Sequence, residues 1–546
     1  MVLVLFAWIA KCQYILNVTE LSEEEIFHYR ATSATWDGRS PSRMGDVNND
    51  GVHDFAIARA RGNDRGVLII FGGAGLSSLG SSTSYEEVSV GQGLKIRRAT
   101  PDNGDWFGSN VDFGDVNGDQ ISDILISSFF ASPLGIERAG QVYVIFGGSH
   151  LTDLGVLEVE TMSPEQGVEI NGTRYIESLH HVSGGGDFNN DGFDDLLIGS
   201  SYGVDNNIGG GNGGIGRAYL LFGGPNFLAN QSSVNLTTEF VVGTNIGLHF
   251  DGSNNGEIVR HVQFLGDVNG DGIDDISISC PITRDNAGTV YIIFGNSNPV
   301  SRNSLSNLRD FSNWDEGVVL DGIIDVNYRL GNVFVSGGDF NGDGINDIAL
   351  GQEASGITGI GVSLAYVVFG GPYLNALGSL SMDELEVGIG LTLNTSVVLG
   401  GSTNISSGGY TAVQFVSDVT GDGMDDLLIG CRLETIDGVL DTGRAYLVYG
   451  GSDVDKQKYV PLNDLPRDWG IIIEGNRDSN SQFGIIVGSA GDINNDGLND
   501  FRIHQGLPQG VTNTYIIYGR IVTASPTSSP VTCGQGYYRD EQMVCR

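Results

Sequence analysis

Hydrophobic residues recur along this chain in short uninterrupted runs that end at glycine. One run is Val142-Tyr-Val-Ile-Phe-Gly-Gly148, and close copies lie at residues 218–224 and 365–371. A strand that is apolar at every position is typically buried on both faces. Other segments alternate, as Gly167-Val-Glu-Ile does, and this period of two marks a strand with one solvated face. The pattern predicts small antiparallel sheets with buried central strands and an alternating outer strand.

A polar nine-residue loop accompanies each of these units. The first copy runs from Asp46 to Asp54, with Gly51 at its sixth position. The other six copies begin at Asp115, Asp187, Asp267, Asp339, Asp418 and Asp492, so consecutive copies are 69 to 80 residues apart. Repetition at a steady period indicates a closed ring or a solenoid. Four short strands in each of seven units predict an all-β, seven-bladed β-propeller with four-stranded antiparallel blades.

The two ends of the repeat region predict how the ring closes. The seventh unit has no alternating segment after Gly519, whereas residues 16–29 align without a gap to residues 157–170. We therefore expect Ile26–Arg30 to form the outer strand of the last blade. Closure over residues 16–520 would also protect strand edges that otherwise invite aggregation.

The composition of the loops matches calcium chemistry. Ca²⁺ takes six to eight oxygen ligands, and a loop can supply side chains at positions 1, 3, 5 and 9 and the carbonyl of position 7. Glycine at position 6 suits the positive φ of the tight turn. The alternative is that these loops are only Asx-type turns. The predicted ligands are Asp46, Asn48, Asp50, Val52, Asp54; Asp115, Asn117, Asp119, Ile121, Asp123; Asp187, Asn189, Asp191, Phe193, Asp195; Asp267, Asn269, Asp271, Ile273, Asp275; Asp339, Asn341, Asp343, Ile345, Asp347; Asp418, Thr420, Asp422, Met424, Asp426; and Asp492, Asn494, Asp496, Leu498, Asp500.

Two loops depart from this pattern. Gln120 replaces the glycine of the second loop, and Thr420 replaces the position-3 Asn of the sixth. Backbone strain at Gln120 and the weaker oxygen of Thr420 predict that these two loops bind calcium most weakly.

Charge and composition narrow the classes of partner. The chain has 67 acidic and 28 basic residues, a net charge of −39. Seven Ca²⁺ ions would add 14 charges and leave −25, which still disfavours nucleic acids and anionic lipid. Residues 1–12 are expected to be a secretory signal peptide, with an N-terminal strand as the alternative. Residues 521–532 have the composition of a Ser/Thr/Pro linker.

Cysteines divide into two groups. Cys280 and Cys431 lie in apolar strand patterns and are expected to be buried free thiols. Cys533 and Cys545 fall in residues 533–546, which resemble the start of an extracellular cysteine-rich segment, and could pair in an oxidising compartment.

The calcium loop and the Tyr-containing strand together resemble the FG-GAP repeat of integrin α-subunit N-terminal propellers over about residues 16–520. The Phe-Gly dipeptide remains at Phe107-Gly108 and Phe483-Gly484. The resemblance implies a secreted or cell-surface scaffold that binds up to seven Ca²⁺ ions and serves cell adhesion or protein-ligand recognition. It also implies an extracellular protein ligand or a β-type partner subunit.

In integrins the ligand binds on the face opposite the calcium loops. The residues that the resemblance places there are Trp106, Phe129, Phe130, Arg174, Tyr175, Tyr202, Tyr328 and Arg329. A sugar-binding propeller lectin is an alternative, and a propeller hydrolase is a further one. FG-GAP repeats also accompany a phospholipase D, but its catalytic part is a separate zinc domain for which this chain has no room. No HExxH motif or nucleophile elbow occurs, so we expect no enzymatic activity.

Overall fold

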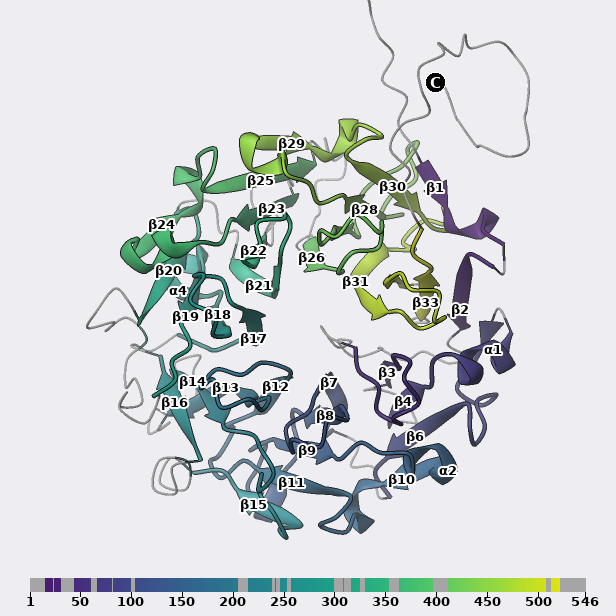
Figure 1. The fold of residues 1–546 in the computed structure, drawn as a ribbon, viewed down its shortest axis with the longest axis vertical. Helices are drawn as coiled ribbons and strands as arrows, with labels where there is room; N and C mark the ends of the chain where they lie inside the picture. Colours follow the sequence, from purple (N-terminus) through teal and green to yellow (C-terminus); the bar gives the residue numbers. More distant parts are fainter. Residues whose placement is uncertain are drawn as a thin grey trace, which may run out of the picture.

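Seven small sheets surround a central axis in the computed structural model (Figure 1). The structure describes residues 15–22, 24–30, 44–59, 66–80, 82–99, 104–204, 215–237, 241, 246–252, 257–298, 308, 316–324, 329–352, 363–395, 411–506 and 512–520. The predicted signal peptide, linker and cysteine-rich segment lie outside these residues. The prediction of a seven-bladed β-propeller is confirmed.

In blades 1 to 6 the main strands follow one another in the chain and pair antiparallel. Blade 1 contains β3 (Phe55–Arg59), β4 (Gly66–Ile70) and β6 (Gly93–Arg97); blade 2 contains β7 (Phe107–Gly114), β8 (Asp123–Ser128), β9 (Gln141–Ile145) and β11 (Gly167–Asn171). Blade 3 contains β12 (Leu179–Ser183), β13 (Leu196–Val204), β14 (Ile215–Leu221) and β16 (Gly247–Asp251); blade 4 contains β17 (His261–Gly266), β18 (Asp275–Cys280), β19 (Thr289–Ile293) and β20 (Gly317–Asp321). Blade 5 contains β21 (Leu330–Gly338), β22 (Asp347–Gln352), β23 (Ser363–Val368) and β25 (Gly390–Thr395); blade 6 contains β26 (Thr411–Phe415), β27 (Leu427–Cys431), β28 (Arg444–Val448) and β30 (Gly470–Glu474).

Blade 7 closes the ring with a strand from the other end of the chain. It contains β31 (Phe483–Gly491), β32 (Asp500–Gly506), β33 (Thr512–Ile517) and β2 (Ile26–Arg30). Strand β2 pairs antiparallel with β33 from Ile26 opposite Ile517 to Arg30 opposite Asn513, and Figure 1 shows the purple N-terminal strands beside the yellow C-terminal ones. The predicted closing strand is therefore confirmed with its predicted bounds.

Among the described residues, six blades carry a short added strand beyond the outer strand, which the prediction of four-stranded blades missed. These strands pair parallel to the outer strands: β10 (Val156–Glu158), β15 (Ser233–Asn235), β24 (Ser379–Ser381), β29 (Tyr459–Pro461), β1 (Ile15–Asn17) and β5 (Ser82–Thr83). Each comes from the segment that precedes the outer strand of the next blade. The outer edge of one blade is thus covered by its neighbour, which hides an edge that could pair with another chain.

Short helices complete the connections. The α-helical turns are α1 (Ala74–Leu79), α2 (Leu151–Leu154) and α4 (Thr283–Asn286), and the 3₁₀ turns are η1 (Val18–Glu20), η2 (Pro133–Gly135), η3 (Val159–Thr161), η6 (Pro372–Ala376), η7 (Met382–Glu384), η8 (Val454–Lys456) and η9 (Leu462–Asp464).

The hydrophobic core is divided into seven clusters, one between each pair of neighbouring blades. Strand β9 is buried at every position, because blades 1 and 3 cover its two faces. The cluster that joins blade 7 to blade 1 contains Phe27 and Tyr29 of the closing strand. Cys280 and Cys431 lie in these clusters as buried free thiols, as predicted. The core therefore holds the blades together around the whole ring.

Candidate metal loops and ligand face

In blades 2 to 7 the predicted calcium loop joins the first two strands, and in blade 1 it lies directly before β3, so the loops share one end of the ring. Position 6 has a positive φ in all seven loops, from 69° at Gln120 to 92° at Gly497. Position 4 also has a positive φ each time, between 55° and 80°. The residues at position 4 are Asn49, Gly118, Asn190, Gly270, Gly342, Gly421 and Asn495. Asn and Gly are the residues that tolerate this conformation best, so two positions fix the turn rather than the one predicted.

Side-chain oxygens hold each loop by accepting amide protons. In the fourth loop, Asp267 Oδ2 accepts from the Gly272 amide at 2.7 Å and its Oδ1 accepts from Asp271 N at 3.1 Å. Asn269 Oδ1 accepts from the Asp271 amide at 2.9 Å. The bonds to position 1 recur in all seven loops. They turn the position-1 carboxylate toward the inside of each loop.

The carboxylate at position 9 is buried and joins the loop to the rest of its blade. Asp195 is fully buried. Its Oδ2 accepts from the Phe188 amide at 3.0 Å, and its Oδ1 accepts from the Gly223 amide at 2.9 Å. Gly223 follows the third strand, and the equivalent glycine donates to the position-9 carboxylate in every blade.

This geometry explains the glycine that ends each hydrophobic run. A Cβ at these glycines would lie 1.9 to 2.5 Å from the carbonyl oxygen of position 8, which is closer than any real side chain approaches. Glycine is therefore required by a close backbone contact, while the position-9 acid accepts its amide proton.

Each loop is also bonded to the next blade. The carbonyl oxygen of position 2 accepts a hydrogen bond from a backbone amide of the next blade. The donor is the residue directly after the glycine that ends the hydrophobic run; Val47 O, for example, accepts from the Gly148 amide at 2.8 Å. The same bond joins blade 7 to blade 1, from the Gly73 amide to Ile493 O at 2.8 Å. Seven such bonds of 2.8 to 3.0 Å connect the loops around the ring. Loop conformation and ring geometry are thus coupled.

The loops concentrate negative charge. Burial, with a smaller contribution from the carboxylates of positions 1 and 5, raises the pKa of Asp54, Asp347 and Asp426 to about 8 and that of Asp500 to about 7. The pKa values of Asp123, Asp195 and Asp275 are raised well above the ordinary range for the same reasons. In the described residues, no Lys or Arg forms a salt bridge with these loop acids.

The donor set of each loop fits a hard divalent cation. It combines carboxylates, an amide or hydroxyl oxygen and a backbone carbonyl, which are the ligand types that Ca²⁺ takes. A dication would also offset the clustered charge that raises the pKa of position 9. Within the described ranges, no three His, Cys, Asp or Glu side chains group closely enough to hold a metal ion. A site in these loops therefore also needs the position-3 side chain and the position-7 carbonyl.

The two loops with unusual sequences differ in the structure as well. Gln120 has a φ of 69°, a region that costs about 1–2 kcal/mol for a residue with a Cβ. The Thr420 hydroxyl donates to Asp418 Oδ1 at 3.3 Å. At position 3 of the other six loops, an Asn oxygen instead accepts the amide proton of position 5.

Three predicted ligand-face residues form an aromatic cluster: Trp106, Phe129 and Phe130. The Phe130 ring centroid lies 4.2 Å from that of Phe129 and 4.9 Å from that of Trp106. Trp106 precedes β7 and the two Phe residues follow β8, so the cluster lies at the strand ends away from the calcium loop. The rings are half-buried.

The rest of the β8–β9 loop and the adjoining loop extend this surface. The Arg138 guanidinium lies 4.9 Å from the Phe130 centroid, a cation–π contact that the sequence did not reveal. The predicted residues Arg174 and Tyr175 are on the adjoining loop, which is bonded to the Arg138 loop by Ser178 N donating to Arg138 O at 3.0 Å. Tyr175 is 56% exposed.

Of the three remaining predicted residues, Arg329 is the one whose side chain the structure describes. The Arg329 amide donates to Asn286 O at 3.0 Å, which places Arg329 at the junction of blades 4 and 5. Tyr202 lies in β13, but its side chain is outside the described part of the structure, and Tyr328 is outside it altogether.

Comparison with known proteins agrees with this geometry. The FG-GAP repeat family model matches residues 180–221, which contain the predicted calcium loop of blade 3 and the strands on either side of it. Integrin alpha-PS2 of Drosophila melanogaster is 27% identical over 38% of this chain and 12% of its own length. Integrin alpha pat-2 of Caenorhabditis elegans is 32% identical over 33% of this chain and 13% of its own length.

The chain contains an FG-GAP repeat match and resembles integrin α subunits. It spans only a small part of the length of the integrin relatives that it matches. The chain is also 26% identical to a phosphatidylinositol-glycan-specific phospholipase D of Dictyostelium discoideum, over 29% of this chain and 17% of that protein. Among the described residues, no helix combines the length and apolar character needed to cross a membrane.

Proposed function

We propose that this chain is a calcium-binding, extracellular β-propeller that recognises a protein ligand or a β-type partner subunit in cell adhesion. The observation that carries the proposal is the seven-fold repetition of one acidic loop in one conformation. Each loop has carboxylates at positions 1, 5 and 9 that form no salt bridge with Lys or Arg among the described residues, and each is bonded to its neighbouring blade. The similarity to integrin α subunits supports the same function.

Calcium would act as a structural ion in this proposal. Positions 1, 3, 5 and 9 and the carbonyl of position 7 would hold it, and the ion would neutralise charge that otherwise repels within the loop. Because each loop is bonded to the next blade, occupied loops would stiffen the whole ring. Extracellular calcium modules have dissociation constants of about 10⁻⁴–10⁻³ M, so the sites would be half to mostly occupied at millimolar calcium.

The aromatic cluster and the adjoining loop are the proposed recognition surface. Aromatic and Arg side chains commonly dominate the energy of protein interfaces. Trp106, Phe129 and Phe130 are held in place by mutual ring contacts, so little conformational entropy is lost when they bind a partner. Nothing in this surface requires bond-making chemistry, and we propose a recognition scaffold rather than an enzyme.

A binding screen with matched variants tests this function. Purified chain would be assayed against immobilised extracellular matrix proteins and soluble integrin β ectodomains, with calcium and with EGTA. Phe130→Ala and Tyr175→Ala should each lower the affinity for a captured ligand by about ten-fold or more, as loss of a hot-spot residue does. Tyr459→Ala is the control, because Tyr459 is 49% exposed but lies on the fifth strand of blade 5, at the outer edge. Capture that survives EGTA, or that both face variants leave unchanged, would contradict the proposal.

A further inference from the structure

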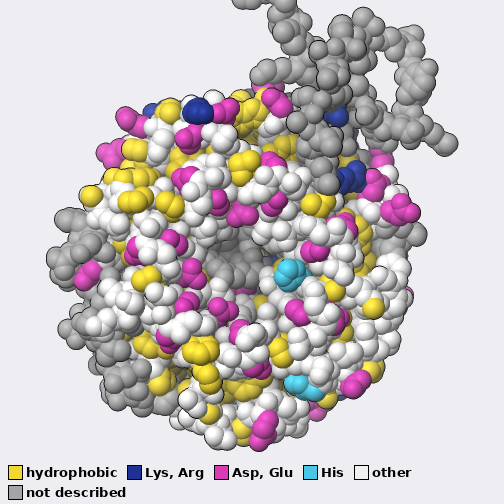
Figure 2. Space-filling model, in the orientation of Figure 1, with side chains coloured by type: hydrophobic (Ala, Val, Ile, Leu, Met, Phe, Trp, Pro, Cys, Tyr) yellow, Lys and Arg dark blue, Asp and Glu magenta, His cyan; other side chains and the backbone are white. Residues whose placement is uncertain are grey.

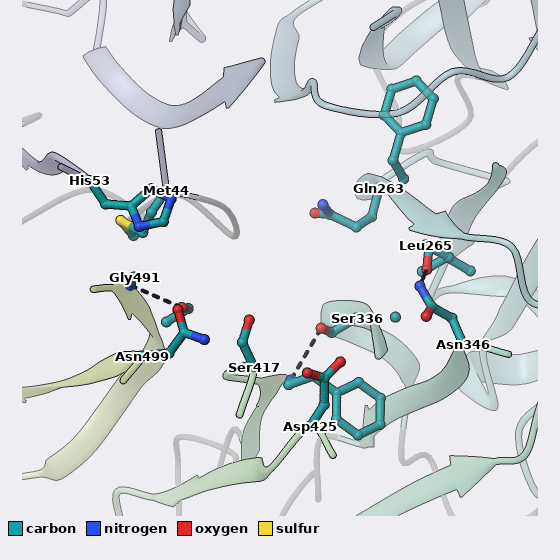
Figure 3. Close-up of a pocket in the computed structure, with 14 residues that line it drawn as sticks. Met44, His53, Gln263, Leu265, Ser336, Asn346, Ser417, Asp425, Gly491 and Asn499 are labelled. Carbon is teal, nitrogen blue, oxygen red and sulfur yellow. Dashed lines mark hydrogen bonds between the residues drawn. The ribbon is translucent and has the colours of Figure 1, made fainter. Parts of the chain in front are cut away.

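A polar cavity lies on the axis of the ring at the end that carries the calcium loops. Its volume is about 280 Å³, and Figure 2 shows a hollow at the centre of the molecule. Position-8 loop residues, among them His53, Asn346 and Asp425, form part of the wall, and inner-strand residues such as Gln263 and Ser336 form the rest. Figure 3 shows these side chains surrounding a common space. The cavity is distinct from the aromatic cluster, which lies at the other end of the strands.

Gln263 provides the strongest sign that this cavity receives a ligand. The residue is only 3% exposed. Its Nε2 donates to Ser183 Oγ at 3.0 Å, but its buried Oε1 has no hydrogen-bond partner among the described residues. Figure 3 shows the Gln263 amide extending into the cavity. A buried carbonyl oxygen without a donor is unfavourable, and a ligand hydroxyl in the cavity would supply that donor.

Other groups in the wall are fixed so that one polar atom remains for a ligand. Asn346 Nδ2 donates to Leu265 O at 2.7 Å, which leaves its Oδ1 as an acceptor. Asp425 Oδ2 accepts from the Asp339 amide at 2.9 Å, which leaves Oδ1. Ser336 Oγ accepts from the Phe415 amide at 3.1 Å, so its hydroxyl proton can be donated. His53 Nδ1 accepts from the Asp492 amide at 3.2 Å, so the neutral ring carries its proton on Nε2.

This lining selects one chemical class. The described residues that line the cavity include no Lys or Arg, and the chain carries a net charge of −39, so phosphates and carboxylates are disfavoured. Separate donors and acceptors around a small volume match a molecule with several hydroxyl groups, because each hydroxyl both donates and accepts. Phe264 and Phe415 also belong to the wall of the cavity. A water occupies about 30 Å³ in the liquid, so the volume has room for one sugar ring.

We propose that this cavity binds a neutral, hydroxyl-rich ligand of monosaccharide size, either a free sugar or the terminal residue of a glycan. The inference does not depend on calcium binding or on adhesion through the aromatic cluster. Its failure would leave the proposed function untouched, and the reverse also holds.

Saturation-transfer NMR on the full chain tests the proposal. The probes are glucose, galactose, mannose, fucose and N-acetylglucosamine, and a glycan array tests terminal residues. We expect at least one probe to bind. Gln263→Met should lower the affinity for that probe by about ten-fold, the effect of losing one hydrogen bond. Gln352→Met is the control, since Gln352 is 2% exposed but lies in β22 and does not line the cavity.

The outcomes separate the sources of the ligand. Binding of free sugars without array binding indicates a free small molecule, and array binding indicates a glycan terminus. Ser417→Ala, which changes another wall residue, serves as the second variant if Gln263→Met does not fold. The proposal is overturned if neither format detects binding at tens of millimolar sugar. It is equally overturned if every folded cavity variant binds as tightly as the wild type.

Discussion

Replacing Gly223 by Ala tests the reason that a glycine ends the hydrophobic run of each blade. The new Cβ would lie 1.9 Å from the carbonyl oxygen of Asp194 and 3.0 Å from that of Val116. Both contacts are with backbone, so no side chain can rotate away. The segment cannot retreat easily either, because the Gly223 amide donates to Asp195 and the Gly224 amide donates to Val116 O.

The size of the effect follows from these contacts. Overpacking a dense region costs about 1–3 kcal/mol, and weakening the amide bond to a carboxylate adds about 1.5–3 kcal/mol. We therefore expect Gly223→Ala to lose about 3–5 kcal/mol of stability. The assay is thermal and guanidinium unfolding in calcium, followed by circular dichroism.

A second glycine of the same blade provides the matched control. Gly192 has a φ of 91°, but no heavy atom lies within 4 Å of the position that a Cβ would take there. Gly192→Ala should thus lower the unfolding free energy only through backbone strain at a positive φ, by about 1–2 kcal/mol. If Gly223→Ala is as stable as the wild type, or loses less than Gly192→Ala, the close-contact explanation is wrong.

Three further predictions concern other parts of the ring. His504 is buried, and burial lowers its pKa to about 3 in the folded chain. In the unfolded chain the pKa of this residue is near 6.5, so the unfolded chain binds the proton first as the pH falls. The stability of the fold therefore decreases as the pH drops from about 6.5 toward 3. Between about pH 7 and about pH 5, the His504→Gln variant should lose about 2 kcal/mol less unfolding free energy than the wild type. Equal losses in the variant and the wild type would refute the role of His504. Thr420→Asn should restore an oxygen that accepts the amide proton of Asp422, and it should raise the calcium affinity measured by titration. An unchanged or lower calcium affinity would contradict the role assigned to position 3. Deleting residues 15–30 removes β1 and the closing strand, so cooperative unfolding should disappear, whereas an unaltered melting curve would contradict the closure.

The ring and its closure could be predicted because the repeated signals are long or periodic. The strand at 142–145 is apolar at every position, and the structure buries it on both faces. The match of residues 16–29 to 157–170 predicted β2 correctly. The short added strands escaped prediction for two reasons. Segments such as Val156–Glu158 are three residues long, which is too short to show a period. Their pairing is also set by the neighbouring blade.

Local chemistry was predicted less completely than the fold. The Asn or Gly at position 4 was visible in all seven loops but was not interpreted as a second positive-φ position. The role of Gly223 needs the position-8 carbonyl beside it, a contact that no local pattern contains. The cation–π contact of Arg138 with Phe130 depends on how one loop folds back on itself. The cavity beside Gln263 brings together residues of several blades, so only the folded ring reveals it.

Calcium titration of the purified chain by isothermal calorimetry, with elemental analysis of the same sample, tests the central claim most directly. The account predicts several bound Ca²⁺ ions per chain with affinities of about 10⁻⁴–10⁻³ M or tighter, and a melting temperature that falls when EGTA removes them. A protein that holds no Ca²⁺ at millimolar concentration, and that melts identically in calcium and in EGTA, would contradict it.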